Sequence, residues 1–315
     1  MQPPYLDRNA VMATLGPADV KDAVRRILVD AANGQAGQAV RRELKPSEMP
    51  GLMGLMPSYR SRAPRLFAAK TVCVMPDNPK RGLPAHQGIC VLFDGEDGHL
   101  VGMAEAGAVT ELRTAALAAL ATQTLARQTP RQHLIVGSGH QALPHIVAMA
   151  QSGQAERLVL WGRNPETAAD VQRRAADRGI EVERAPDLET AVRGSDVVTM
   201  VTGARAPLLK AEWLAPGSHV NAMGSSTPVV REFGPDVIGT AKLFVDDVES
   251  VMSLAGEFVD FDSKPPARTL GAVLAGAEGG RTQDNDVMLF KSVGIGIQDL
   301  AVLELLFSDH LAAAK

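Results

Sequence analysis

The sequence predicts an α/β protein, in which a doubly wound parallel sheet follows a smaller α+β region. Three observations support this prediction. The length of 315 residues suggests about two domains. Beyond residue 132, short apolar stretches alternate with segments of helical periodicity, as expected for a parallel sheet with helices on both faces. Upstream of residue 128, strand-forming runs are separated by turn residues, which indicates a separate strand-rich region.

The first region begins with a predicted helix over 17–32. Pro17 suits the first helical position, and Val20, Val24 and Ile27 lie on one apolar stripe. Strands are expected over 66–75, 88–93 and 99–104, with a hairpin turn at 94–98, and a second helix over 110–127.

The segment 128–132 interrupts that helix and marks the predicted domain boundary. The strands expected after it are 133–136, 157–161, 180–183, 196–201, 219–223 and 242–245. Helices should follow the first two of these strands, ending near Ser152 and covering 165–178. An apolar helix over 295–311 is expected to return to the first region. The predicted domains are therefore 1–127 with about 295–315, and 128–294.

The composition argues against several classes of protein, namely nucleic-acid-binding, membrane-spanning and disulfide-rich or zinc-binding proteins. Lys and Arg number 32 against 36 Asp and Glu, which leaves no basic excess for binding nucleic acid. No apolar run is long enough to span a membrane, and the first residues lack a signal-peptide pattern, so we expect a cytoplasmic protein. Cys73 and Cys90 lie in apolar stretches, which predicts two buried thiols rather than a disulfide or a zinc site. We expect no metal.

The sharpest local motif is the glycine-rich turn Gly137-Ser138-Gly139-His140-Gln141-Ala142. Gly137 permits the tight turn, Gly139 lets the backbone approach a pyrophosphate, and Ala142 allows close packing of helix and strand. The following helix N-terminus would supply free N–H groups to the anion. A plain glycine turn is the alternative. Because the motif follows a strand and opens a helix, it predicts a Rossmann-type dinucleotide site.

The second strand of this unit bears on the choice of cofactor. It ends Trp161-Gly162-Arg163-Asn164, without the acidic residue that would hold the ribose hydroxyls of NAD. Arg163 can instead pair with the 2′-phosphate of NADP. The sequence therefore favours NADPH, with NAD possible. A solvated surface arginine is the alternative for Arg163.

The segment Val109-Thr110-Glu111-Leu112-Arg113-Thr114-Ala115-Ala116, followed by the glycine-rich turn, resembles the ornithine cyclodeaminase/mu-crystallin family. Further segments at 38–41, 54–57, 221–224 and 290–294 occur in family order. The resemblance implies a Rossmann domain for NAD(P), a substrate domain that also forms a homodimer, and hydride transfer at the α-carbon of an amino or imino acid.

Three cations are expected to bind the substrate carboxylate. Arg113 would lie in the first turn of the second helix, where a cation opposes the helix dipole and suits an anion site; a salt bridge to Glu111 or to another acid is the alternative. Arg41 matches a carboxylate-binding arginine of the family. Because Arg42 follows directly, the match could be shifted by one residue, and a surface arginine is the alternative for Arg41. Lys70 matches the family's active-site lysine and could exchange a proton near neutrality; a lysine snorkelling at a strand end is the alternative.

A departure from the family pattern concerns Ser226, which stands where cyclodeaminases have an Asp. A hydroxyl cannot replace a general base, and the resemblance in this respect is to the ketimine reductases. Glu232 or Asp236 could offer a displaced carboxylate. His86 could face the substrate or be a structural hydrogen-bonding group. The residues expected at the cofactor are Arg113, Thr114, Gly137, Gly139, His140, Gln141, Ala142, Arg163, Asn164, Thr202, Met223, Gly224, Ser226, Ser292 and Gly294.

Together these expectations predict an oxidoreductase that reduces a cyclic ketimine, such as Δ1-pyrroline-2-carboxylate, to an L-imino acid. Arg41, Lys70 and Arg113 would converge on the carboxylate of the substrate beside the cofactor. The alternatives are an ornithine cyclodeaminase with bound NAD, an amino-acid dehydrogenase, and a non-catalytic ligand-binding protein of the same family.

Overall fold

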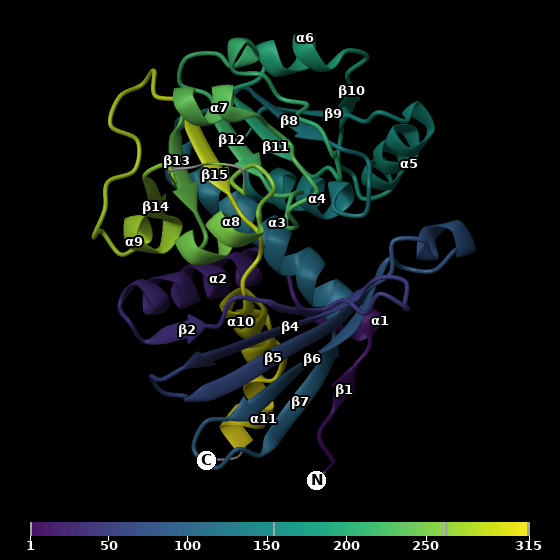
Figure 1. The fold of residues 1–315 in the computed structure, drawn as a ribbon, viewed down its shortest axis with the longest axis vertical. Helices are drawn as coiled ribbons and strands as arrows, with labels where there is room; N and C mark the ends of the chain where they lie inside the picture. Colours follow the sequence, from purple (N-terminus) through teal and green to yellow (C-terminus); the bar gives the residue numbers. More distant parts are fainter. Residues whose placement is uncertain (1, 154, 260, 262–263, 314–315) are drawn as a thin grey trace. The chain divides into compact units, whose positions relative to one another are not determined.

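A computed structural model describes residues 2–153, 155–259, 261 and 264–313, so residue 1 and residues 314–315 of the predicted range 295–315 lie outside it. The chain divides into two compact units (Figure 1). The first contains the chain up to Arg113 and from Ile295 onward, and the second is Thr114–Gly294. This division falls earlier than the expected boundary at residues 127 and 128. The later part of helix α3 packs within the second unit, where the Thr122 hydroxyl accepts a hydrogen bond from Asn221.

The first unit is built on a sheet of order β1-β7-β6-β5-β4-β2, with β3 paired to β4. Its pairs are antiparallel except β1 with β7. Its elements are β1 (Tyr5–Leu6), α1 (Arg8–Thr14), α2 (Pro17–Ala32), β2 (Ala36–Gln38), β3 (Arg42–Leu44), β4 (Leu52–Arg60), β5 (Leu66–Val74), the 3-10 turn η1 (Asn78–Arg81), β6 (His86–Asp94), β7 (Leu100–Glu105), the start of α3 (Ala106–Leu125), α10 (Gly296–Leu306) and α11 (Ser308–Ala313).

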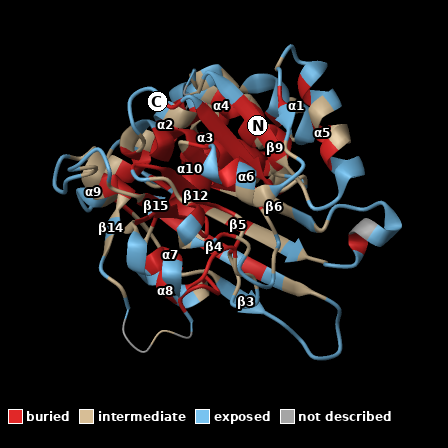
Figure 2. Cartoon of the chain, turned by 90° about the horizontal axis from the view of Figure 1, so that it is seen from above, coloured by how far each residue is buried: buried red, intermediate tan, exposed pale blue. Residues whose placement is uncertain are grey.

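One face of this sheet is covered by α10, which also packs on α2. Figure 2 shows the buried residues of this helix in red. Side chains alternate along β5, so Leu66, Ala68 and Lys70 point into the core while Phe67 and Cys73 are exposed on the other face. The prediction of two buried thiols is therefore right for Cys90 and wrong for Cys73.

The second unit is built on a parallel sheet of order β10-β9-β8-β11-β12-β15-β13-β14. Its elements after α3 are β8 (Gln132–Val136), α4 (Ala142–Ser152), β9 (Arg157–Trp161), α5 (Pro165–Ala176), β10 (Glu183–Arg184), α6 (Leu188–Arg193), β11 (Val197–Met200), the 3-10 turn η2 (Ala211–Trp213), β12 (His219–Ala222), α7 (Pro235–Thr240), β13 (Lys242–Val245), α8 (Val248–Leu254), β14 (Ala267–Thr269), α9 (Leu270–Leu274) and β15 (Met288–Lys291). The predicted fold class, a parallel α/β sheet with a smaller α+β unit, is confirmed.

Strand order reverses between β8 and β11: β9 and β10 continue on one side, and β12 and β15 on the other. In open parallel sheets, ligands bind at the carboxyl ends of the strands beside such a switch point. The loops that carry the predicted cofactor residues therefore lie at the edge of the sheet where a dinucleotide is expected.

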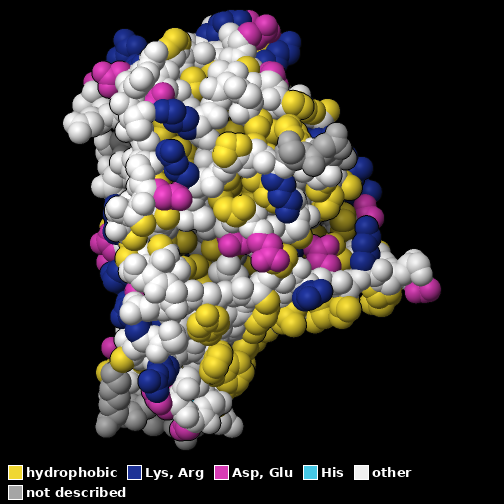
Figure 3. All heavy atoms as spheres, turned by 60° about the vertical axis from the view of Figure 1, so that its left-hand side comes forward, with side chains coloured by type: hydrophobic (Ala, Val, Ile, Leu, Met, Phe, Trp, Pro, Cys, Tyr) yellow, Lys and Arg dark blue, Asp and Glu magenta, His cyan; other side chains and the backbone are white. Residues whose placement is uncertain are grey.

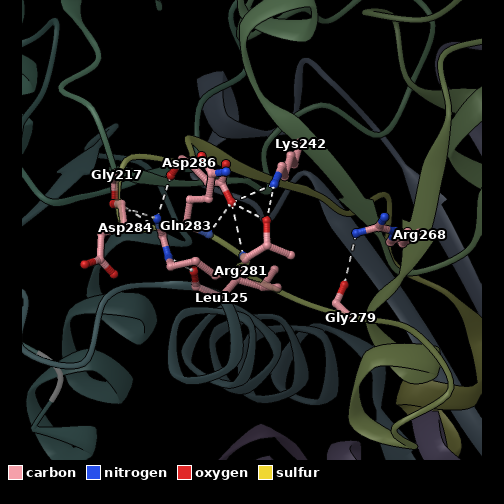
Figure 4. A network of polar contacts seen from close by, with 10 residues as sticks. Leu125, Gly217, Lys242, Arg268, Gly279, Arg281, Gln283, Asp284 and Asp286 are labelled. Carbon is pink, nitrogen blue, oxygen red and sulfur yellow. Dashed lines mark hydrogen bonds and ion pairs between the residues drawn. The ribbon is translucent and has the colours of Figure 1, made fainter.

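Charged side chains form hydrogen bonds within and around residues 281–286, the segment before β15 (Figure 4). One carboxylate oxygen of Asp286 accepts hydrogen bonds from Lys242 Nζ and from the backbone N–H groups of Thr282 and Gln283. These contacts hold the pKa of Asp286 far below its usual value, with the Lys242 bond the largest cause. Arg281 donates to the carbonyl of Leu125, the last residue of α3. One of the terminal carbonyl groups of this helix is thus satisfied within the second unit.

Candidate active site

Lys70 and Arg113 meet at a buried carboxylate in the first unit. Lys70 Nζ lies 2.9 Å from one carboxylate oxygen of Asp299 and donates to the other at 3.1 Å. Arg113 Nε lies 3.4 Å from Asp299, and Arg113 Nη1 donates to Gln298. Only 4% of the Lys70 side chain is exposed, and it lies in the middle of β5, so it is not a lysine snorkelling at a strand end.

Burial lowers the pKa of Lys70, and the positive charge of Arg113 lowers it further, whereas Asp299 opposes both effects. The thiol of Cys90 is buried beside this group, and its pKa is raised, mainly by burial. A lysine with a lowered pKa can exchange a proton more readily near neutral pH than one in water.

Arg41 lies close enough to Arg113 for the two charges to affect each other. Its Nε lies 2.9 Å from Glu43, and 13% of its side chain is exposed. Burial lowers the pKa of Arg41, with a further contribution from the charge of Arg113. Arg42, by contrast, is exposed on β3. The structure therefore favours Arg41 over its neighbour as the second arginine of the cluster.

The helix that carries Arg113 begins at Ala106, not at residue 110, so Arg113 does not lie in the first turn. The dipole argument for an anion site at this position is wrong. The helix extends upstream because the Glu105 carboxylate accepts hydrogen bonds from the N–H groups of Gly107 and Ala108. The suggested partner Glu111 pairs with Arg8, at 2.6 and 2.7 Å. The acid that Arg113 contacts is Asp299, so the alternative of a salt bridge to another acid is borne out.

Sequence reasoning missed Asp299 and Gln298. Both lie in the first turns of α10 and are buried. A Gln-Asp pair in the first turn of a mostly apolar helical segment was the available signal, because a buried carboxylate requires a cationic partner. His86, the first residue of β6, is exposed.

In the second unit, the glycine-rich turn joins β8 to α4 as predicted. Gly137 has φ +117°, and a Cβ there would lie 2.9 Å from the carbonyl oxygen of Val201, so a side chain would be strained. The space beside Gly139 is open, and Ala142 is buried at the start of α4.

The N-terminus of α4 is suited to an anion. Gln141 occupies its N-cap position without a capping side-chain hydrogen bond, and His140 before it is exposed. The N-termini of α5, α6 and α8 are instead capped by the side chains of Asn164, Asp187 and Asp247. A helix N-terminus without a side-chain cap, beside an open glycine, fits the pyrophosphate of a dinucleotide.

Two residues predicted to bind the cofactor, Arg163 and Asn164, follow the end of β9 and differ in their surroundings. The Asn164 side chain accepts hydrogen bonds from the N–H groups of Glu166 and Thr167, which explains it as a helix cap. Arg163 is exposed, and no partner for its guanidinium is found among the described residues. A pocket of about 370 Å³ opens between the ends of β9 and β10, and Arg184 lines it. Sequence reasoning missed Arg184.

Thr202 and Gly224 follow the ends of β11 and β12 and are held by one carboxylate. Glu232 accepts from the N–H and hydroxyl of Thr202 at 2.8 and 3.0 Å, and from Gly224 N at 2.8 Å. Glu232 is fully buried. Asp236 accepts from Ala211 N at 2.8 Å. Glu232 is therefore not freely available as a substitute for the missing Asp at Ser226, whereas Asp236 is exposed and stays a candidate.

The remaining predicted residues occupy the same edge or its approach. Ser292 and Gly294 follow β15, where the Asp246 carboxylate accepts from the Ser292 hydroxyl at 2.7 Å and from Gly294 N at 3.0 Å. Met223 is buried directly after β12, and Ser226 lies two residues beyond Gly224. Thr114 is buried in α3, at the beginning of the second unit.

Comparison with known proteins identifies the class to which this fold and these residues belong. The model of the ornithine cyclodeaminase/mu-crystallin family matches residues 3–313, so the chain belongs to this family, as predicted.

Among its relatives, the ketimine reductase mu-crystallin of Mus musculus is 30% identical over 277 residues, covering 88% of this chain and 86% of that protein. The structure of Δ1-pyrroline-2-carboxylate reductase from Thermococcus litoralis, in complex with NADH and L-proline, is 27% identical. It has a TM-score of 0.92 and covers 98% of each chain. An archaeal alanine dehydrogenase dimer with bound NAD is also 27% identical, with a TM-score of 0.91 over 100% of this chain and 98% of that one.

No helix in the described part of the chain combines the length and apolar character needed to cross a bilayer.

Proposed function

We propose that the protein is an NADPH-dependent reductase of a cyclic ketimine such as Δ1-pyrroline-2-carboxylate, with an L-imino acid as product. The observation that carries this proposal is the charge of the cluster in the first unit. Arg41, Lys70 and Arg113 form a group of three basic side chains, and Glu43 and Asp299 are among the carboxylates that they contact. A partly desolvated group of basic side chains favours a small anionic ligand such as a monocarboxylate.

The proposed roles follow from the type of each group. The guanidinium groups of Arg41 and Arg113 bind the carboxylate and orient the α-carbon. Lys70 donates a hydrogen bond to the same carboxylate or exchanges a proton at the substrate nitrogen, and its lowered pKa suits either task. Bound NADPH supplies the hydride that reduces the C=N bond. Orientation of the reacting carbon is the main contribution of these side chains to the rate.

The preference for NADPH is supported by two arginines at neighbouring strand ends. Arg163 follows β9, and Arg184 ends β10 and lines the pocket between them. A guanidinium forms paired, charge-assisted hydrogen bonds with a phosphate group. The two relatives whose structures contain NADH or NAD show that the family also uses the cofactor without this phosphate.

Reduction is favoured over cyclodeamination because Ser226 stands where cyclodeaminases have an Asp. Its hydroxyl offers no carboxylate, and Glu232 is buried with its oxygens bonded to Thr202 and Gly224. Ring closure with loss of ammonia requires proton transfers for which the hydroxyl of Ser226 is not a general base.

The test is a spectrophotometric assay of the full chain with Δ1-pyrroline-2-carboxylate and each nicotinamide cofactor. Stoichiometric loss of NADPH with formation of proline is the expected result. Conversion of ornithine to proline and ammonia without net cofactor change would identify a cyclodeaminase instead. Oxidation of alanine coupled to reduction of the cofactor would identify a dehydrogenase, and tight NADPH binding without any turnover would identify a ligand-binding protein.

We further propose a homodimer formed through the open face of the sheet in the first unit. Met53, Leu55 and Tyr59 on β4, with Phe67 on β5, are exposed by 41 to 56%. Their alternation places them on the face opposite Lys70, and Tyr59 pairs in register with Phe67. Figure 3 shows hydrophobic side chains gathered in a strip on this unit. Contiguous apolar surface of this kind marks a protein interface.

Light scattering combined with gel filtration tests the dimer. The parent chain should have twice the mass of one chain, and Phe67→Glu together with Leu55→Glu should give a monomer. Arg65→Glu, a change at an exposed residue just before β5, is the control and should leave the mass unchanged. A monomeric parent chain would refute the proposal.

A further inference from the structure

Glu232 joins two neighbouring strand ends in the second unit. Its Oε1 accepts from the N–H and hydroxyl of Thr202, which follows β11, and its Oε2 accepts from Gly224 N, which follows β12. The three distances lie between 2.8 and 3.0 Å, and the side chain is fully buried. One carboxylate therefore fixes the spacing of two loops at the carboxyl edge of the sheet.

The loops are in direct contact at this point. A Cβ on Gly224 would overlap the carbonyl oxygen of Thr202 and approach Glu232 Oε1. Glycine is required here for close approach of two backbones, not for an unusual φ. The carboxylate and the glycine thus act together to hold Thr202 and Gly224 against each other.

Glu232 is itself held by a second layer of buried charges. Its backbone N–H donates to Glu257 at 2.9 Å. Lys291, the last residue of β15, lies 3.7 Å from Glu257 and donates to the carbonyl of Ser225 at 2.6 Å. The Lys291 and Glu257 side chains are fully buried. Burial raises the pKa of Glu232, while the charge of Lys291 and the N–H donors favour the carboxylate form.

These loops lie on one side of the switch point of the sheet. The glycine-rich turn follows β8 and Arg163 follows β9, so the pyrophosphate and adenosine half of the cofactor belongs on the β8–β9 side. Strands β11, β12 and β15 lie on the other side, where the second nucleotide-binding half of a doubly wound sheet is found.

We propose that Glu232 is a positioning residue that fixes Thr202 and Gly224 for the nicotinamide half of the cofactor. All three of its short contacts are to donors and engage both carboxylate oxygens, which is the geometry of a group that holds two loops together. The proposal rests on the proposed function, since it requires a dinucleotide at this edge of the sheet.

The test compares two ligands on the parent chain and on Glu232→Gln. NADPH carries the nicotinamide half, and 2′,5′-ADP lacks it. Glutamine keeps the size of the side chain but turns an NH₂ group towards an N–H donor, so one of the two loop contacts must break. The dissociation constant for NADPH should rise about tenfold or more, whereas that for 2′,5′-ADP should change less than about twofold. Glu212→Gln, at an exposed carboxylate, is the matched control and should leave both constants unchanged.

The pH dependence of kcat gives a second readout. A positioning role leaves the shape of the profile unchanged in Glu232→Gln, whereas loss of an ionisation with unchanged NADPH affinity would show a proton carrier and overturn the proposal. An equal loss of affinity for NADPH and for 2′,5′-ADP in Glu232→Gln would also overturn the proposal. If Glu232→Gln does not fold, Thr202→Val can be used instead, because it removes one of the three contacts. In this variant the dissociation constant for NADPH should rise about threefold, and that for 2′,5′-ADP should not change. A parent chain that binds neither ligand would refute the proposed function itself, whereas a parent that binds both with no selective loss in the variants would refute this inference alone.

Discussion

Acidification from pH 7 to pH 5 should destabilise the second unit, because two of its buried histidines are held in the neutral form. His133 on β8 and His219 on β12 are both fully buried, and both stand in register with Val197 of the strand between them. His133 is hydrogen-bonded to Thr199 at 2.8 Å, and His219 to Asn221 at 2.9 Å. Burial, the largest cause in each case, lowers the pKa of His133 to about 3 and that of His219 to about 4.

The magnitude follows from the difference between the folded and unfolded pKa values. Both histidines have an ordinary pKa of 6.5, so below that pH the unfolded chain takes up protons that the folded chain does not. Their contribution to stability is therefore present above pH 6.5 and is lost as the pH falls towards the folded values. Between pH 7 and pH 5 each histidine costs about 2 kcal/mol of unfolding free energy, or about 4 kcal/mol for the pair.

Urea denaturation followed by tryptophan fluorescence measures this loss. The two tryptophans of the chain, Trp161 and Trp213, both belong to the second unit, so their signal reports its unfolding. His219→Gln keeps a donor near Asn221 and removes the titration, so the loss between pH 7 and pH 5 should fall to about 2 kcal/mol. His310→Gln, at an exposed position, is the control and should keep the full loss. An unchanged pH dependence in His219→Gln would refute the reasoning.

Three further predictions concern the candidate site. Lys70→Met should bind NADPH normally but lose most of kcat/KM, about a hundredfold or more, in steady-state assays; near-normal turnover would exclude the proposed role. Arg163→Ala should lose about tenfold in kcat/KM with NADPH and little with NADH, and a variant that keeps the parent preference would show that this arginine does not read the 2′-phosphate. Gly137→Ala should lower the unfolding free energy by about 2 kcal/mol and weaken dinucleotide binding, because φ is +117° and the Cβ would meet Val201; calorimetry and fluorescence titration check both effects, and unchanged values of both would contradict them.

Elements with a strong local signal were predicted from the sequence. Helix α2 and strands β9 and β13 have the predicted bounds 17–32, 157–161 and 242–245. Strand β15 was not predicted, although it lies in the middle of the parallel sheet between β12 and β13. It has four residues and ends in Lys291, so no periodic pattern distinguishes it from a loop. The predicted strand over 180–183 is reduced to Glu183–Arg184 at the sheet edge.

In the candidate site, too, the local features were predictable from the sequence and the long-range contacts were not. The glycine-rich turn and the absence of an acid after β9 are local features, and a short stretch of sequence determines them because they depend on backbone conformation and on adjacent residues. The partners of the predicted cations are not local. Asp299 is separated from Lys70 by 229 positions and lies on a helix whose pattern is apolar. Glu232 is separated from Thr202 by 30 positions, and Glu257 from Glu232 by 25.

The sequence by itself therefore determined the family, the parallel α/β architecture, the glycine-rich turn, and the types of side chain available for binding a carboxylate. Only the tertiary structure decided which carboxylates contact those cations, and that Glu232 joins the loops of Thr202 and Gly224. The physical reason is that a buried charge must find its partner within hydrogen-bonding distance, and packing brings such partners together from elements that are remote in the chain.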